Sequence, residues 1–138
     1  MTDRFVDANI FVRHITNDDP IRSPASRALF QAIRNGHVTA WTTDLVAAEV
    51  VFVLSSKRTT YNMSREAIRD ALLPLLLLPG LDVPSKTLFP RIFDYFVGLA
   101  IDYIDAYHAV LVERRTPPEL YSYDFHFDRV TSLRRIEP

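Results

Sequence analysis

Four acidic residues stand next to apolar segments of the sequence, where a charged side chain needs an explanation. They are Asp7, Glu49, Asp105 and Asp124. A buried carboxylate is costly unless it is paired or binds a metal ion, so these residues are candidates for one shared metal site. For Asp7 and Asp124 a helix cap or a turn is the alternative interpretation, and for Glu49 it is a salt bridge to an arginine.

A cluster of this kind predicts a bound hard divalent cation. Neighbouring carboxylates repel each other and raise each other's pKa values, and a divalent cation removes that penalty. The sequence contains no cysteine, and oxygen ligands favour Mg²⁺ or Mn²⁺ over zinc. Because Mg²⁺ takes its remaining ligands from water and substrate phosphates, the predicted chemistry is metal-assisted hydrolysis at phosphorus.

A second acid and two histidines lie close to these residues in the sequence. Asp102 precedes Asp105 by three positions in the predicted helix 101–115, so both lie near one helix face. We prefer Asp105 as the metal ligand, because Asp102 also suits a helix N-terminus through the helix dipole. His108 and His126 are candidates for a metal or general-base role, with a hydrogen-bonded packing role as the alternative. His108 follows Asp105 by three positions, so it could also form a hydrogen bond with that carboxylate.

The elements that must position these residues alternate between strand and helix. Short strands are predicted at residues 4–7, 37–41, 81–83, 120–123 and 134–137. Helices are predicted at residues 9–14, 23–35, 44–56, 65–78, 85–98 and 101–115. This order predicts one layered α/β domain over residues 1–138, with a mainly parallel sheet and helices on both faces. Ligands bind at the carboxyl ends of such strands, where Asp7 and Asp124 stand.

The composition limits the possible classes of protein. With 138 residues, 48% of them hydrophobic and 24% charged, the chain is expected to be a soluble globular protein. We expect a cytoplasmic location, because no secretory signal is evident and the apolar stretch 71–81 is shorter than the ~20 residues of a membrane span. The formal net charge of -1 means that nucleic-acid binding depends on local basic patches or on bound metal.

Four segments, in order along the chain, resemble the motifs of PIN-domain nucleases, especially VapC-type toxins of toxin–antitoxin pairs. FVDANIFVR at residues 5–13 resembles the opening strand motif. Thr42-Thr43 followed by Glu49-Val50 resembles the second acidic motif. DAYHA at residues 105–109 resembles the third motif, and SYDFHFD at residues 122–128 resembles the fourth.

This resemblance implies a three-layer α/β/α fold and assigns roles to individual residues. It implies that Asp7, Glu49, Asp105 and Asp124 form the catalytic site, with the metal bound by Asp7, Asp105 and Asp124. The implied auxiliary residues are Asn9, Thr43, Ser122, Asp102 and Asp128. Members of the family cleave RNA endonucleolytically with Mg²⁺ or Mn²⁺. The VapC members are neutralised by a small antitoxin protein and usually form dimers through helices.

Other side chains are candidates for contacts with RNA or with a protein partner. Arg13, Lys57 and Arg58 are candidates for phosphate contacts. Tyrosines are candidates for stacking on unpaired bases, with core packing as the alternative; they are Tyr61, Tyr95, Tyr103 and Tyr121. The apolar stretches 50–54 and 72–78 belong either to the core or to an interface with a second copy or an antitoxin helix.

Two other functions are compatible with parts of this pattern. A non-catalytic PIN-like module that binds RNA or protein would lack some of the acids, whereas all four are present here. Another metal-dependent phosphohydrolase, such as a small phosphatase, would need a second Asp two residues after its nucleophile, where this chain has Asn9.

Overall fold

The structure is a computed structural model in which residues 3–138 are described, and the chain divides into two compact units. One unit ends at Thr87 and the other runs from Leu88 to Pro138. The N-terminal unit contains, in order, β1 (Arg4–Phe5), α1 (Ala8–Thr16), α2 (Arg22–Arg34), β2 (Ala40–Trp41), α3 (Asp44–Ser55), α4 (Arg65–Leu76) and β3 (Leu81–Asp82). A short 3-10 helix, η1 (Lys86–Leu88), lies where the two units join in the sequence.

The three strands of the N-terminal unit form a parallel sheet in the order β1-β2-β3. Main-chain hydrogen bonds continue past the strands: Val6 N–H donates to Trp41 O at 2.8 Å, and Thr42 N–H donates to Asp82 O at 2.8 Å. The buried hydroxyl of Thr42 donates to Val6 O at 2.8 Å. These bonds fix the carboxyl ends of β1 and β2 side by side, at the points where α1 and α3 begin.

Side-chain caps define the starts of three helices in this unit. Asp7 caps α1, and its carboxylate accepts from Ala8 N–H at 2.8 Å. Thr43 caps α3 and accepts from Val46 N–H at 3.1 Å. Ser64 caps α4 and accepts in the same way. Each cap satisfies a main-chain donor that the helix leaves unpaired, which explains why the helices begin where they do.

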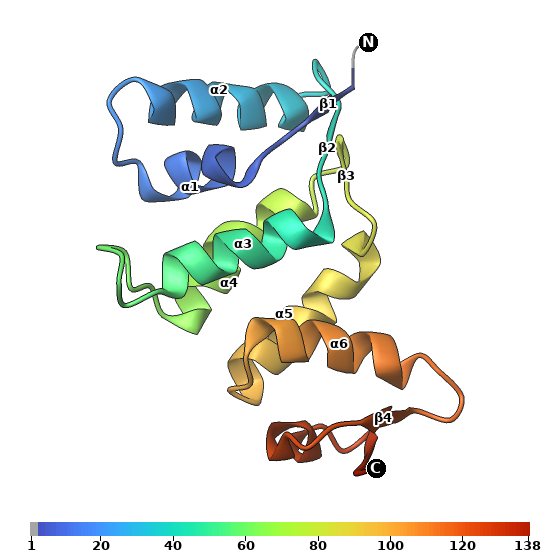
Figure 1. The fold of residues 1–138 in the computed structure, drawn as a ribbon. Helices are drawn as coiled ribbons and strands as arrows, with labels where there is room; N and C mark the ends of the chain where they lie inside the picture. The colour runs from blue at the N-terminus through green and yellow to red at the C-terminus, as the bar shows by residue number, and fades with distance from the viewer. Residues whose placement is uncertain (1–2) are drawn as a thin grey trace. The chain divides into compact units, whose positions relative to one another are not determined.

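Apolar contacts between helices form the core of the N-terminal unit. Figure 1 shows α1 and α2 lying side by side, and their rings Phe11 and Phe30 pack with centroids 5.1 Å apart. Helices α3 and α4 contact each other. Leu54 of α3 and Ile68 and Leu72 of α4 are fully buried. This packing holds α1 and α3, the two helices that follow the strand ends, in fixed positions within the unit.

The C-terminal unit contains α5 (Phe89–Gly98), α6 (Tyr103–Glu113), β4 (Glu119–Tyr121), η2 (Phe125–Arg129) and β5 (Arg134–Ile136). Strands β4 and β5 pair in parallel. Helices α5 and α6 pack through aromatic rings, with the Tyr103 ring 5.5 Å from Phe93 and 5.8 Å from Phe96. Glu113 adds a polar contact, because it accepts from Tyr95 Oη at 2.6 Å and from Ser132 Oγ at 2.8 Å.

All predicted helices and strands are present in the described part of the chain, with ends that differ by a few residues. The α/β fold class and the parallel pairing are confirmed, although the five strands pair as one set of three and one set of two. Helix α4 continues past Pro74 to Leu76, and η2 replaces the turn expected after the fourth strand. That the whole chain is one domain stays a prediction. No helix within residues 3–138 is long and apolar enough to span a membrane.

Candidate functional site

Asp105 lies in the first turn of α6, close to the positive end of the helix dipole. The neighbouring residues Tyr103, Ala106 and Ala109 are buried, and the Tyr103 ring packs on α5. Small alanine side chains allow α6 to pack closely, and this leaves the Asp105 carboxylate half-buried. A carboxylate at this position is electrostatically favoured by the helix but has lost part of its hydration.

Asp124 follows β4 and caps η2. Its main-chain N–H donates to Ser122 Oγ at 2.9 Å, and its carboxylate accepts from His126 N–H at 2.8 Å. The Nδ1 atom of the His126 ring lies 3.0 Å from the same carboxylate oxygen. The side chain of Phe127 is buried and anchors η2. Asp124 is therefore held by its neighbours in a defined orientation.

The C-terminal unit brings Asp105, Asp124 and His126 together. Each offers one ligand atom, and these atoms lie within 4.8 Å of one another. Burial raises the pKa of the Asp105 carboxyl above its ordinary value, and the negative charges of Asp124 and Asp102 raise it further. The nearby His108 and His126 oppose this increase of the pKa. Ionised Asp105 is thus short of positive charge in this unit.

The chemistry of this cluster fits a divalent cation. Within residues 88–138 no lysine or arginine forms a salt bridge with Asp105 or Asp124. Two carboxylates and an imidazole nitrogen are common ligands of Mn²⁺ and similar ions, and the carboxylates alone suit Mg²⁺. A cation held by Asp105 and Asp124 would offset both the partial burial of Asp105 and the repulsion between the two carboxylates.

Asp7 and Glu49 lie in the N-terminal unit. Asp7 is exposed and caps α1, as its alternative interpretation predicted, although a capping carboxylate keeps an oxygen free for other ligands. The prediction that Glu49 is buried is wrong, because its side chain is exposed on α3. Leu45 and Phe52 on the same helix are also 80% and 71% exposed, so an apolar sequence did not mean a buried helix. No arginine pairs with Glu49 within its own unit.

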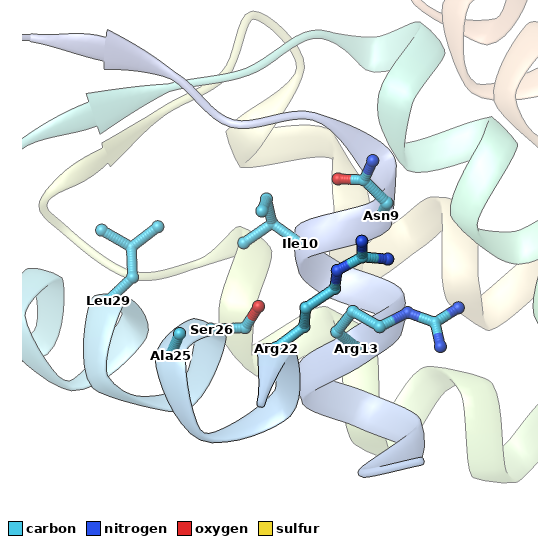
Figure 2. A pocket seen from close by; sticks show the side chains of 7 residues that line it. All are labelled: Asn9, Ile10, Arg13, Arg22, Ala25, Ser26 and Leu29. Carbon is cyan, nitrogen blue, oxygen red and sulfur yellow. The ribbon is translucent and has the colours of Figure 1, made fainter. Parts of the chain in front are cut away.

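The N-terminal unit also contains a pocket of about 660 Å³ between α1 and α2. Figure 2 shows the side chains that line it, which are Asn9, Ile10, Arg13, Arg22, Ala25, Ser26 and Leu29. Asn9 belongs to the first turn of α1, two residues after Asp7, and is exposed. Asn9 and Arg13 therefore line the same pocket. Asn9 was predicted to act beside the catalytic acids, and Arg13 was predicted to contact RNA.

Comparison of the sequence with known families gives a match to the PIN domain over residues 4–133, nearly the whole chain. The chain belongs to the PIN-domain family. PIN domains are typically nucleases, and they generally bind divalent metals. Six helices with small parallel sheets are consistent with the three-layer α/β/α fold of a PIN domain. No curated protein matched this sequence.

The predicted auxiliary residues of this PIN domain have identifiable structural roles. Ser122 orients the main chain of Asp124, as described above, and Thr43 caps α3. Asp102 is exposed at the N-terminus of α6 and contributes to the raised pKa of Asp105. Asp128 forms a salt bridge with Arg135 at 3.0 Å. Lys57 and Arg58 are exposed in the loop after α3. Whether these residues act in catalysis stays a prediction.

Most of the tyrosines proposed for base stacking have other partners. Tyr103 is in the core, as the alternative predicted, and Tyr95 donates to Glu113. Tyr61 donates to Asp18 at 2.6 Å. Tyr121 is 75% exposed and remains a candidate for stacking.

Two features of the structure go beyond the site residues predicted from the sequence. His126 was a candidate for a metal or general-base role but was not placed in the acidic site, and its ring lies beside Asp124 because of the path of η2. Arg22 and Ser26 line the pocket in Figure 2. A signal for them existed in the sequence, because the run 22–34 contains three arginines and no acid.

The raised pKa of Asp105 predicts an unusual effect of Asp105→Asn on metal-free protein. Because the folded-state pKa exceeds the ordinary value of 3.8, ionisation of Asp105 lowers the free energy of unfolding. This cost is absent below pH 3.8 and complete above the raised pKa. In EDTA, Asp105→Asn should melt at a higher temperature than wild type at neutral pH, and the difference should shrink as the pH falls through the raised pKa.

Thermal unfolding over a pH series measures this effect. Asp128→Asn is the control, since it removes a carboxylate that already has an arginine partner and should not stabilise the protein. Added Mn²⁺ should raise the melting temperature of wild type more than that of Asp105→Asn. If Asp105→Asn were less stable than wild type in EDTA, and Mn²⁺ raised both melting temperatures equally, ionised Asp105 would not destabilise the metal-free protein.

Proposed function

We propose that this PIN domain is a metal-dependent endoribonuclease that hydrolyses phosphodiester bonds of cytoplasmic RNA. The observation that carries the proposal is the cluster of Asp105, Asp124 and His126 in a chain that belongs to a family of typical nucleases. Half-buried carboxylates with no basic partner in their unit suit a bound metal ion better than a structural role.

The proposed roles follow from the chemistry of each side chain. Asp7, Asp105 and Asp124 hold Mg²⁺ or Mn²⁺, and Glu49 acts with them as the fourth catalytic acid. A bound ion of this kind supplies a Lewis acid that stabilises negative charge at phosphorus and lowers the pKa of a water molecule. The exposure of Asp7 and Glu49 is compatible with this proposal, because a residue that meets a phosphate must be accessible to it.

Neighbouring residues keep the acids in position. Ser122 Oγ and the His126 main chain hold Asp124 from two sides, so the carboxylate needs little reorganisation before it binds a cation. Such support around a metal ligand is typically worth 10–100-fold in affinity or activity. Asn9 and Thr43 stand beside Asp7 and at the start of α3, and they are proposed to orient water or substrate.

We further propose that the chain is the toxin of a type II toxin–antitoxin pair, neutralised by a small cognate antitoxin protein. The motif order that resembles VapC toxins supports this role. Cleavage of cellular RNA by such a protein would inhibit translation and growth, and binding of the antitoxin would relieve the inhibition.

Cleavage of an unstructured RNA by the purified chain tests the nuclease proposal. We expect cleavage by wild type with Mg²⁺ or Mn²⁺ and none with EDTA. Asp7→Asn and Asp124→Asn should lose more activity than the roughly 100-fold that changes around a metal ligand produce. Glu119→Gln, which removes an exposed acid of the same unit that lies outside the four motifs, should retain most activity.

The same proteins separate the alternatives. RNA binding without cleavage by folded wild type would indicate a binding module. Cleavage of a phosphomonoester but not of RNA would indicate another phosphohydrolase. Full activity of Asp124→Asn would contradict the assigned site. Induced expression of wild type in bacterial cells should arrest growth and that of Asp124→Asn should not, whereas equal growth would contradict the toxin role.

We also propose a homodimer formed through α3. Leu45 and Phe52 are seven positions apart, which places them on one side of the helix, two turns from each other. Two large apolar side chains that are 80% and 71% exposed on one side are costly to leave in water. Burial of these two side chains against a second copy would remove that cost, and the interface has to leave the Glu49 carboxylate on the same helix open to substrate.

Light scattering of the purified protein measures the oligomeric state. Wild type should be a dimer, and Phe52→Glu should shift it towards monomer because a buried charge is costly. Ile21→Glu is the matched control, since Ile21 is 81% exposed but lies outside α3. A monomeric wild type, or equal effects of the two variants, would contradict an interface on α3.

A further inference from the structure

Helices α1 and α2 form a basic hairpin in a chain whose formal net charge is -1. The two helices contain no Asp or Glu. Their arginines are Arg13, Arg22, Arg27 and Arg34. The pKa of His14 is lowered, first by burial and then by the positive charges of Arg27 and Arg34. Asp18 and Asp19 in the turn between the helices pair with Arg13 and Arg22 and offset part of this charge. The four arginines still give the hairpin an excess of positive charge, of the kind that an almost neutral protein needs for binding polyanions.

The pocket between these helices has a cationic side and an apolar side. Figure 2 shows the Arg22 side chain extending from α2 towards Asn9 on α1, with the Arg13 side chain nearby. Ile10 and Leu29 lie on the other side of the pocket. The residues that line it include no acid, and its volume of about 660 Å³ is in the range of small-molecule sites. Such a lining suits a ligand with one anionic and one apolar part.

The two arginines differ in how they are held. Arg13 donates to Asp18 at 2.6 Å and to Tyr61 Oη at 3.3 Å, which fixes its guanidinium in place. Arg22 Nε lies 3.9 Å from Asp19, beyond hydrogen-bond distance, and the Arg22 side chain is 79% exposed. The Asp19 carboxylate instead accepts main-chain N–H groups at the start of α2. Arg22 thus keeps donors available for a ligand.

We propose that this pocket binds one nucleotide of an unpaired RNA strand, with its phosphate at Arg22 and Arg13 and its base against Ile10 and Leu29. Guanidinium groups bind phosphate oxygens through paired hydrogen bonds. A base in a duplex is stacked and paired, so only an unpaired strand presents a base to an apolar wall. The inference rests on the proposed nuclease function and adds to it a nucleotide-binding pocket between α1 and α2.

A neighbouring pocket extends this binding surface. It has a volume of about 440 Å³ and shares Ile10 and Leu29 with the first pocket. Its lining adds Arg4 and His37 and again includes no acid. The shared residues make the two pockets one groove along α1, in which the next nucleotide of the strand has a second apolar surface and a second cationic side chain.

Binding of labelled RNA to a cleavage-disabled protein tests the inference. We would use Asp124→Asn in EDTA, an unstructured RNA, a duplex of equal length, and salt from low to physiological concentration. Arg22→Gln should weaken binding of the unpaired RNA by about tenfold, as expected for a charge-assisted hydrogen bond. It should also reduce the slope of log K against log salt by about 0.7, the value for one phosphate contact of a single strand.

Two further variants make the test specific. Arg34→Gln removes the same charge from the same helix outside the pocket, so it should weaken binding of unpaired RNA less than Arg22→Gln does. Ala25→Trp fills the pocket without changing the charge and should weaken binding of unpaired RNA. Duplex RNA should respond less than unpaired RNA to both Arg22→Gln and Ala25→Trp.

Several results would overturn the inference. Equal losses for Arg22→Gln and Arg34→Gln would mean a diffuse basic surface and no site. Unchanged RNA binding by Arg22→Gln and Ala25→Trp, with loss of binding to an acidic peptide, would mean a protein interface. If wild type cleaves RNA and both variants bind RNA normally, the pocket is not an RNA-binding site, and the nuclease proposal stands. If RNA binding depends on Arg22 but wild type cleaves no RNA, the pocket is an RNA-binding site, and the nuclease proposal is wrong.

Discussion

Partial burial of the Asp105 carboxylate, together with its repulsion by Asp124, is the constraint on which the proposed site depends. Helix α6 and the turn after β4 bring Asp105 and Asp124 into one group with His126. Folding has to offset the burial and the negative charge that raise the pKa of Asp105. The helix dipole, the hydrogen bonds around Asp124 and the aromatic packing of α5 on α6 supply part of this offset. A divalent cation bound by both carboxylates would remove this cost.

The charges of this protein are segregated along the chain. The hairpin of α1 and α2 is basic, whereas the cluster of Asp105 and Asp124 is acidic and belongs to the other unit. A net charge of -1 hides both features. A phosphodiesterase needs each of them, because a metal ion requires acids and the substrate backbone requires cations. The overall charge therefore says little about whether such a chain can bind RNA.

The elements of the fold could be predicted well because their signals are local. Thr43 and Ser64 mark helix starts in the sequence and cap α3 and α4 in the structure. Asp105 and Asp124 could be chosen because each stands at the start of a turn or helix beside apolar residues. The membership of Asp7 and Glu49 in the same site was predicted by resemblance and stays a proposal.

The errors have a common physical cause, which is that sequence patterns do not show what covers a surface. Glu49 was expected to be buried because its helix is apolar, but Leu45 and Phe52 of that helix are exposed as well. His126 was considered for a metal or general-base role but was not placed in the acidic site, because its contact with Asp124 depends on the path of η2. The pocket that contains Arg22 arises from the packing of α2 on α1, and helix patterns alone specify no cavity.

The most direct test of the central claim is titration of the purified protein with Mn²⁺, followed by electron paramagnetic resonance of the free ion. We expect wild type and Asp128→Asn to bind Mn²⁺ and so to decrease the signal of the free ion. We expect Mg²⁺ to compete with Mn²⁺ for the same site. Asp105→Asn and Asp124→Asn should bind the ion much more weakly. The metal site would be contradicted if folded wild type did not bind Mn²⁺. It would also be contradicted if a double variant, with Asp105→Asn and Asp124→Asn together, bound Mn²⁺ as tightly as wild type.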